Sequence, residues 1–437
     1  MEQPRVVELE VPGWGAVSVP KDALALAVLG VVSFVAFFLL DPFRIIDKVD
    51  LRLVRLYEAP KKSAVRGRKV LCIVNPFSGR KEGLWQYAKV GHPLLKAAGA
   101  QVELVQTTHA GHFAELGAAM ASDFLQDAQK HPFPDGGVLI FGGDGSVNEF
   151  LNGAISEASG GTNSLDDPKV VDVLEALKFA HVPCGSANGI AASAGATTPY
   201  QVIVQAIEGD GTGHHTAALD LTQVILEANS TAEESRMVDS HCVSWGIISD
   251  HDELIEDKWR HLGMLKMVLA PIYCILRNPS YAGTILLDPV ALDLDAEKHG
   301  YCDGAELPEA EELSKDPRYS GWQSIRRIEG DFIMVTLANL SDASYDVKIA
   351  PGLGWSDGEA ALVVVKAGLS RLSLIRIFLA FEDGSYLKLP FVQAYKVRRA
   401  HILADKVGSF TTSGAMLEDT RSVRLETIQG AANYVKS

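Results

Sequence analysis

Cysteines are few in this sequence, and none is arranged to bind zinc. The five cysteines are scattered and odd in number: Cys72, Cys184, Cys242, Cys274 and Cys302. No two of them have the short spacing of a zinc-binding pair, and an odd, scattered set does not form a disulfide framework. The cysteines therefore predict reduced thiols in an intracellular protein.

Positive charge is also scarce. The chain has 40 Lys and Arg against 55 Asp and Glu, a formal net charge of −15. Binding to nucleic acid needs a basic surface that neutralises phosphates. The charge balance therefore argues against nucleic acid as a partner.

The common nucleotide-binding motifs are missing too. The sequence has neither the Walker A pattern nor an early G-x-G-x-x-G, and it has no internal repeat. This excludes a P-loop protein and a simple dinucleotide fold. The length of 437 residues and the hydrophobic fraction of 47% are enough for two domains with their own cores.

One long apolar run stands near the N-terminus. Residues 23–40 carry no charge and are just long enough to cross a bilayer. Basic residues follow the run: Arg44, Lys48, Arg52, Arg55, Lys61, Lys62, Arg66, Arg68 and Lys69. The positive-inside rule then places the rest of the chain in the cytoplasm. We expect an N-terminal arm, residues 1–67, with a membrane segment at 23–40, the alternative being a buried core helix.

From residue 68 to about residue 212, strands and helices alternate. Short apolar runs at 69–75, 101–108 and 137–143 read as strands, and a fourth begins at 180. Each is followed by a loop and a helical stretch. This order predicts a parallel sheet with helices on both faces, a three-layer α/β domain.

The alternation stops in the second part of the chain, residues 213–437. Strand-like runs occur at 218–227, 241–249, 283–288, 331–340, 359–368 and 394–402. Most of them are not linked by helices, and one helical stretch, 252–277, interrupts them. This pattern predicts an antiparallel β-sandwich domain.

Three glycine-bearing loops follow strands of the α/β domain. The first has Asn75, Ser78 and Gly79, the second Gly142, Gly143 and Gly145, and the third Gly185, Ser186 and Asn188. Ligands of open α/β sheets bind at the carboxyl ends of the strands. Glycine lets the backbone approach a phosphate, and the N-terminus of the following helix attracts its charge. Together the loops predict a phosphate-binding cradle; singly, each would be an ordinary tight turn as often as not.

Asp144 lies between Gly143 and Gly145 in the second loop. Phosphoryl transfer needs positioning, charge neutralisation and a group that takes the proton of the attacking hydroxyl. An aspartate on this turn can do so directly or through Mg²⁺. Glu149, one helical turn later, would support the nucleotide or metal, or would simply lie on a solvated helix face.

Five motifs in the same order resemble one family. They are NPFSG (75–79), GGDGS (142–146), PCGSANGIAAS (183–193), SWGIISDHD (244–252) and RHLGMLK (260–266). They are similar to the motifs of lipid kinases of the diacylglycerol kinase superfamily, and within it most similar to those of the sphingosine (long-chain base) kinases. Ceramide kinases differ in the third loop. The resemblance runs from about Val70 to the C-terminus.

The resemblance implies a role for individual residues. Asp144 matches the catalytic base, and Asp252 matches the acid that binds the polar head of the lipid. Nucleotide-contacting positions are matched by Asn75, Thr107, Glu149, Gly185, Ser186, Arg260 and Lys266. The implied cofactors are ATP and Mg²⁺, with no metal ligand assigned. A carboxylate at 252 would pair with the ammonium of a sphingoid base; the alternative is a helix N-cap.

The chain departs from the family pattern at two places. The spacing from Asp252 to Arg260 is one residue longer than in the family. Near the C-terminus, Ser413, Gly414 and Ala415 stand where the family has Asp-Gly-Glu. The missing acids imply weaker binding of ATP and Mg²⁺, which Ser413→Asp with Ala415→Glu is expected to restore.

The prediction from sequence is an enzyme that phosphorylates the primary hydroxyl of a sphingoid base at the cytoplasmic face of a membrane. A diacylglycerol or other lipid kinase would share the loops without needing Asp252. An NAD kinase also has a GGDG turn, although the apolar run and SWGIISDHD disfavour it. A weakly active lipid or nucleotide sensor is the third alternative, because the acidic pair is missing.

Overall fold

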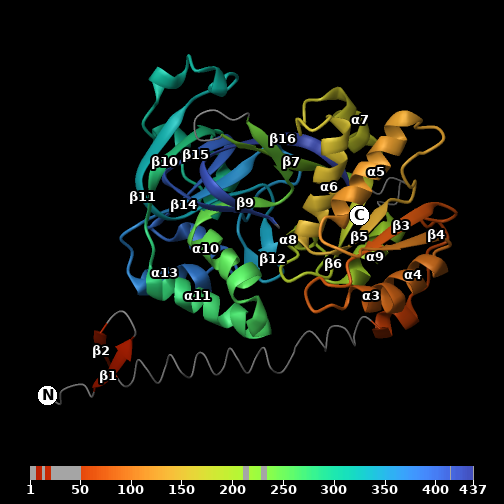
Figure 1. Cartoon of the computed structure of the whole chain (residues 1–437), viewed down its shortest axis with the longest axis horizontal. Helices are drawn as coiled ribbons and strands as arrows, with labels where there is room; N and C mark the ends of the chain where they lie inside the picture. The colour runs from red at the N-terminus through yellow and green to blue at the C-terminus, as the bar shows by residue number, and fades with distance from the viewer. Residues whose placement is uncertain are drawn as a thin grey trace.

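The protein has an α/β part and an antiparallel part that lie side by side (Figure 1). The computed structural model describes residues 6–11, 15–20, 51–209, 216–227, 234–413 and 415–436. The predicted membrane segment, residues 23–40, lies outside the described residues. Within those ranges, no helix combines the length and the apolar character that crossing a bilayer requires. Strands β1 (Val6–Val11) and β2 (Gly15–Pro20) pair as an antiparallel hairpin.

The α/β part is built on four parallel strands. They are β3 (Lys69–Val74), β4 (Gln101–Gln106), β5 (Val138–Gly142) and β6 (Lys178–Pro183). Their order across the sheet is β4-β3-β5-β6, and every pairing is parallel. Strand β5 is buried along its whole length, as expected for a parallel sheet covered on both faces. The predicted parallel sheet is confirmed.

Helices cover both faces of this sheet. Helices α5 (His112–Gln126), α6 (Asp144–Ala158) and α7 (Pro168–Ala176) pack against one another on one face. On the other face, α4 (His92–Ala97) and α9 (Pro199–Glu208) pack together with the π-helical turn η1 (Tyr87–Gly91). Short helices α3 (Gly83–Gln86) and α8 (Gly189–Ser193) follow the first and third glycine loops. The three predicted layers are therefore present (Figure 1).

The C-terminal part is antiparallel. Its main strands are β7 (Thr216–Leu226), β8 (Ser235–Asp239), β9 (Cys242–Gly246), β10 (Tyr281–Pro289), β11 (Arg326–Ala338), β14 (Ala360–Lys366), β15 (Val392–Thr412) and β16 (Ala415–Val435). The order β10-β11-β14-β15-β16 is extended by β7 and β8, and β9 pairs with both β11 and β15. The predicted antiparallel sandwich is confirmed, whereas strands β8 and β16 were not predicted.

Backbone pairing joins the two parts. Strand β16 runs parallel to β6, with Asn433 opposite Lys178 and Tyr434 opposite Phe179, so that one sheet of twelve strands passes through both parts. A small hairpin of β12 (Asp342–Ser344) and β13 (Val347–Lys348) lies against helix α8 (Figure 1). The last strand of the chain thus completes the edge of the first domain's sheet.

A helical layer lies beside the antiparallel strands. It contains α10 (Ile247–Glu253), the π-helical turn η2 (Leu254–Lys258), the 3₁₀ turn η3 (Arg260–Leu265) and α11 (Lys266–Arg277), with α13 (Arg371–Leu379) packed on α11. The predicted strand 241–249 is wrong in its last three residues, which begin α10. The left-handed backbone of Gly246 turns the chain from strand into helix there.

The remaining described elements are short. They are helix α12 (Leu294–His299) and the 3₁₀ turns Gly304–Glu306, Glu311–Leu313, Pro317–Tyr319 and Ser385–Lys388.

Candidate active site

The three glycine loops meet at one edge of the parallel sheet. They follow β3, β5 and β6, which are neighbours and parallel, so their carboxyl ends point the same way. A methyl group on Gly79 would lie 2.6 Å from the carbonyl oxygen of Cys184, and one on Gly185 would lie 2.5 Å from the Cα of Gly143. The loop backbones therefore approach one another as only glycine permits. This bare backbone cradle fits the phosphate groups of a nucleotide.

Side chains within the loops hold their shape. In the first loop the Asn75 side-chain oxygen accepts a hydrogen bond from the Phe77 amide (2.8 Å), and the Ser78 carbonyl accepts one from the Lys81 amide (2.8 Å). In the third loop the Asn188 side chain makes two hydrogen bonds to Gly185: it accepts one from the Gly185 N–H (2.8 Å) and donates one to the Gly185 carbonyl (2.9 Å).

Ser186 is exposed at the tip of the third loop. The backbone beneath it is held by Asn188, which has a left-handed conformation with φ of 62°. Ser186 is therefore placed where a ligand in the cradle can reach it without rearrangement of the loop.

The second loop leads directly into helix α6. Gly142 ends β5, Gly143 precedes the helix and Gly145 is its second residue. The Gly142 carbonyl accepts a hydrogen bond from the Cys184 amide (2.8 Å) and contacts a ring nitrogen of His181 (3.0 Å). The second loop is thus fixed to the strand that carries the third.

Asp144 is the first residue of α6 and is buried. Its carboxylate accepts hydrogen bonds from the backbone N–H groups of Gly189 (3.1 Å) and Ile190 (2.9 Å) at the start of α8. Burial raises the pKa of Asp144, but electrostatic interaction with His181 and His241 and the two N–H donors outweigh the effect of burial and lower the pKa. The carboxylate is therefore ionised at neutral pH and able to accept a proton.

Two further predicted nucleotide positions flank the loops. Thr107 follows β4 and is buried, and its amide donates to the Val74 carbonyl at 2.9 Å. Glu149 is half-buried beside the start of α5. Burial raises the pKa of Glu149, against the effect of backbone amides at the start of α5, and its Oε1 has no hydrogen-bond partner among the described residues. Glu149 therefore does not lie on a solvated helix face.

Asp252 lies near the end of α10, on the antiparallel part. Its side chain is 37% exposed and lies 3.2 Å from the His251 ring. The N-cap alternative for Asp252 is wrong, because α10 already begins at Ile247 and its N-cap is Gly246. The neighbouring Asp250 is occupied by Arg277 and Tyr281. Glu253 pairs with Lys258, so among the described side chains Asp252 is the acid of α10 without a Lys or Arg partner.

The stretch between Asp252 and Arg260, which is one residue longer than in the family, contains the π-helical turn η2. A π turn accommodates one added residue within a helix, so the chain on either side keeps its direction. The ammonium group of Lys266 donates to the Ile255 carbonyl at 2.5 Å, within the helical layer. The side chain of Arg260 lies outside the described residues.

Comparison with known proteins agrees with this geometry. Residues 69–224 match the profile of the diacylglycerol kinase catalytic domain. Sphingosine kinase 2 of Arabidopsis thaliana is 26% identical over 372 residues, which cover 80% of this chain and 69% of that protein. Sphingosine kinase 1 of Homo sapiens is 26% identical over 339 residues, covering 75% and 80%. Over 75–80% of its length the chain is similar to these sphingosine kinases, and residues 69–224 match the diacylglycerol kinase catalytic domain. It is a lipid kinase.

More distant similarities agree on the class of protein and on the fold. Ceramide kinase of Mus musculus is 23% identical over 363 residues, which cover 78% of this chain and 64% of that protein. A crystal structure of a diacylglycerol kinase from Bacillus anthracis str. Sterne has a TM-score of 0.51 at 16% identity, covering 86% of this chain and 99% of that chain. That likeness shows a shared fold.

In this lipid kinase, position 413, where the family has the first acid of its Asp-Gly-Glu, lies next to a buried carboxylate. Ser413 lies in the turn between β15 and β16, and its amide donates to Oδ2 of Asp239 at 2.7 Å. The Ser413 hydroxyl donates to Oδ1 of Asp239 at 3.3 Å. Ala415 is exposed, as are Glu418 and Asp419 further along β16. The carboxylate nearest to position 413 therefore comes from β8.

Asp239 links this turn to the helix that carries Asp144. Its Oδ2 accepts from the side-chain amide of Asn148 on α6 (2.9 Å), and its Oδ1 accepts from the backbone N–H of His241 (2.7 Å). The His241 ring contacts the Asp342 carbonyl through Nε2 (2.8 Å) and the Ser413 hydroxyl through Nδ1 (3.2 Å). Both parts of the molecule are thus joined behind the candidate base.

Sequence reasoning missed three of these buried polar residues, His181, Asp239 and His241. Each stands in or beside a run that is otherwise mostly apolar, FAHVP for the first and MVDSHCV for the other two. A polar group is buried in such a run only when it has a partner or a task. That interruption of the pattern was the available signal.

Backbone glycines, rather than a set of acids, fit the cofactor. In the described part of the chain, no group of three or more His, Cys, Asp and Glu side chains is arranged to hold a metal ion. The cradle fits the phosphates of ATP, and Mg²⁺ bound to those phosphates would neutralise part of their charge. All five cysteines are free, so none takes part in a disulfide.

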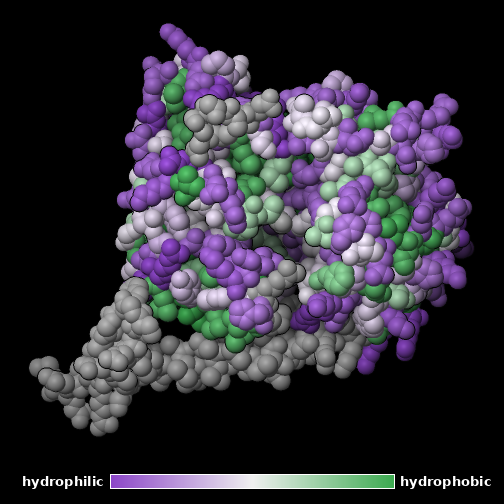
Figure 2. All heavy atoms as spheres, in the orientation of Figure 1, coloured by the Kyte–Doolittle hydropathy of each residue, from purple (hydrophilic) through white to green (hydrophobic). Residues whose placement is uncertain are grey.

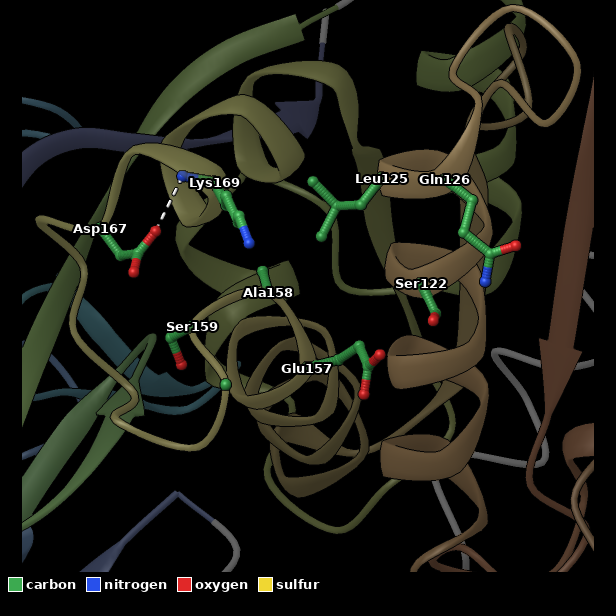
Figure 3. Close-up of a pocket in the computed structure, with 9 residues that line it drawn as sticks. Ser122, Leu125, Gln126, Glu157, Ala158, Ser159, Asp167 and Lys169 are labelled. Carbon is green, nitrogen blue, oxygen red and sulfur yellow. Dashed lines mark hydrogen bonds between the residues drawn. The ribbon is translucent and has the colours of Figure 1, made fainter.

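A pocket elsewhere in the α/β part is separate from this site. It lies at the C-terminal ends of α5 and α6 and the start of α7 (Figure 3), and is lined by Ser122, Leu125, Gln126, Glu157, Ala158, Ser159, Gly160, Asp167 and Lys169. Asp144 is at the other end of α6, about 20 Å away at the rise of an α-helix. The pocket is therefore not part of the phosphate cradle.

Proposed function

We propose that this lipid kinase transfers the γ-phosphoryl group of ATP to the primary hydroxyl of a sphingoid long-chain base, giving the 1-phosphate. One observation carries the proposal: the ionised Asp144 lies where the three glycine loops meet. The names of the similar proteins support the substrate class, because they include sphingosine kinases and a sphingoid long chain base kinase of Schizosaccharomyces pombe.

The residues of the site divide the reaction between them. The backbone of the three loops binds the phosphates of ATP, with Mg²⁺ reducing their charge. As the substrate hydroxyl oxygen bonds to the γ-phosphorus, its proton passes to Asp144, and the bond to ADP breaks with its electron pair on the departing phosphate oxygen. The backbone N–H groups of Gly189 and Ile190, at the start of α8, donate to Asp144 and favour its ionised form until then.

The lipid is recognised by the helical layer of the C-terminal part. Asp252 would pair with the ammonium group of the base, which diacylglycerol and ceramide lack. The apolar stretch 262–276 would lie along the alkyl chain. Some side chains of this stretch belong to the protein core and others lie at the surface. Cys274 and Ala270 are buried, whereas Tyr273 and Leu276 are exposed.

We further propose that the enzyme works at a membrane, with its catalytic part in the cytoplasm. The apolar run 23–40 and the basic residues after it support this proposal. In Figure 2 apolar side chains also gather along the edge where Figure 1 places α11 and α13. Exposed there are Leu265, Tyr273, Leu276, Leu372, Ile375 and Leu379. A patch of this kind favours contact with lipid.

The experiment measures phosphate transfer from labelled ATP to sphingosine, phytosphingosine, ceramide and diacylglycerol. We expect product with the two bases, and loss of turnover by a factor on the order of 10²–10⁴ in Asp144→Asn, since a positioned proton acceptor is removed. Asp172→Asn, on the exposed face of α7, is the matched control. Preference for diacylglycerol would overturn the substrate, and an active Asp144→Asn would overturn the base.

A further inference from the structure

His181 is a fully buried histidine that the proposed mechanism does not yet use. It lies on β6, beside strand β5, which ends two residues before Asp144, and none of its surface is exposed. Its Nε2 lies 3.0 Å from the carbonyl oxygen of Gly142. A carbonyl oxygen can only accept a hydrogen bond, so Nε2 carries the hydrogen of the neutral ring.

The other ring nitrogen then faces Asp144 with a lone pair. Among the described residues His181 Nδ1 has no hydrogen-bond partner, and it lies 3.5 Å from Oδ1 of Asp144. Two acceptors that face each other in a buried place are unfavourable, because neither is solvated and no hydrogen joins them. If one proton is added, Nδ1 of His181 and Oδ1 of Asp144 can share it in a hydrogen bond.

We infer that His181 is a positioning residue that holds the substrate's proton together with Asp144 during phosphoryl transfer. The inference rests on the proposed role of Asp144 as base. When the hydroxyl oxygen bonds to the γ-phosphorus, its O–H bond breaks and the proton goes to the carboxylate. The new O–H of Asp144 donates to Nδ1, or Nδ1 takes the proton and donates back to Oδ1. The pair gains one proton, and the leaving ADP keeps the electron pair of the broken P–O bond.

The side chains around His181 and Asp144 do not take part in the proton transfer between these two residues. Tyr434 on β16 accepts the backbone N–H of His181 at 3.1 Å, and burial raises the pKa of its phenol, so it stays neutral. His241 faces the pair from beyond Gly189, but both of its ring nitrogens already have partners. Burial lowers the pKa of His181 and the charge of Asp144 opposes that change, so the two groups titrate as one unit.

The first test is the pH profile of kcat in His181→Gln. Glutamine can still donate to the Gly142 carbonyl but has no nitrogen in the place of Nδ1. We expect kcat to fall roughly tenfold or more with the KM for ATP unchanged, since part of the proton acceptor is lost. We expect the acid limb of the profile to move about one unit lower, since Asp144 alone binds a proton less tightly than the pair.

The matched control is Tyr434→Phe, which removes the other polar contact of His181 and leaves Nδ1 in place. Its acid limb should stay where it is in the wild type, whatever happens to stability. If His181→Gln folds and also keeps the wild-type acid limb, the inference is wrong and His181 is only structural.

The second test needs neither substrate nor a folded His181 variant. In ¹⁵N-histidine-labelled full-length protein, the Nδ1 resonance of His181 should shift with pH at the apparent pKa of the acid limb. In Asp144→Asn that pKa should change by one unit or more, because the partner carboxylate is gone. An unchanged titration overturns the pairing. A titration that depends on Asp144 in an enzyme whose Asp144→Asn variant still turns over would instead overturn the base role in the proposed function.

Discussion

At the scale of single residues, Asp239 provides a carboxylate next to position 413, where the acids of the family pattern are missing. Its two oxygens accept four hydrogen bonds, from the side chain of Asn148, the backbone of His241, and the amide and hydroxyl of Ser413. A carboxylate has about four acceptor sites, so all are used. Asp239 therefore supplies a carboxylate at this place but is engaged in joining the two parts of the molecule.

The substitution Ser413→Asp is then expected to destabilise the protein rather than to restore a site. It would set a second carboxylate against Asp239, which is fully buried. An unpaired charge forced into such a place costs about 3 kcal/mol or more of unfolding free energy. Urea denaturation measures the loss. The double variant Asp239→Ser with Ser413→Asp exchanges the two side chains across the same contact, so it should recover most of the lost unfolding free energy. A Ser413→Asp variant as stable as the wild type would contradict this account.

The two facing glycines of the cradle give a second residue-scale prediction. In Gly185→Ala the new methyl would lie 2.5 Å from the Cα of Gly143, whereas in Gly143→Ala it would lie 3.4 Å from the Cα of Gly185, an ordinary contact. Gly185→Ala should lower the unfolding free energy by roughly 1–3 kcal/mol through overpacking. Gly143→Ala should fold as the wild type does. Both should weaken ATP binding measured by calorimetry, because both methyl groups enter the cradle.

At the scale of elements, the helical layer from α10 to α11 is where we propose that the lipid binds. The chain there passes through a π turn and a 3₁₀ turn before α11 begins. Within this layer Asp250 is tied to Arg277 and Tyr281, and Lys266 to a backbone carbonyl. Asp252 is partly exposed beside them, and among the side chains that the structure describes it contacts only its neighbour His251.

Asp252→Asn is therefore expected to raise the KM for sphingosine far more than the KM for ATP. A hydrogen bond to a charged group is worth about 1.5–3 kcal/mol, which corresponds to roughly a tenfold to hundredfold change in KM. Initial rates with each substrate varied in turn measure the two effects. Asp257→Asn, an exposed acid of the same layer, is the control and should change neither constant. Equal changes in both constants would remove Asp252 from the lipid site.

At the scale of the whole molecule, one sheet carries both parts, and buried polar groups hold its far side together. His401 on β15 is buried between the Tyr319 hydroxyl, 2.9 Å from Nδ1, and the Ser422 hydroxyl, 2.6 Å from Nε2. Burial lowers the pKa of His401 to about 4, although the charge of Glu227 opposes the change. The folded protein therefore keeps this ring neutral where an unfolded chain would protonate it.

Stability should consequently fall as the pH is lowered from about 6.5 to about 4, because in that window the unfolded chain binds one more proton than the folded one. The loss due to His401 over the whole window is on the order of 3 kcal/mol by the size of the shift. Urea denaturation at pH 7.5, 5.5 and 4.5 measures it. His401→Gln should show a shallower dependence on pH, while His131→Gln, at an exposed position, should keep the wild-type slope. Equal slopes in all three proteins would assign the acid sensitivity to other groups.

The sequence by itself determined the parallel sheet, the antiparallel part and the three loops that form the cradle. These features follow from local signals: apolar runs of strand length, and glycines directly after them, as in β5 and Gly142. Where local signals conflicted, prediction was weaker. The strand predicted through Ser249 ends at Gly246, because a left-handed glycine turns the chain into α10.

Only the tertiary structure decided what surrounds Asp144. His181 comes within 3.5 Å of it from another strand, and Ser413 meets Asp239 across 174 positions of the chain. Strand β16 likewise completes the first domain's sheet by pairing with β6. Such contacts depend on how distant segments pack, and a pattern of neighbouring residues contains no distance between them. The glycine loops of the cradle could therefore be predicted from the sequence, whereas the residues that surround Asp144 could be identified only from the tertiary structure.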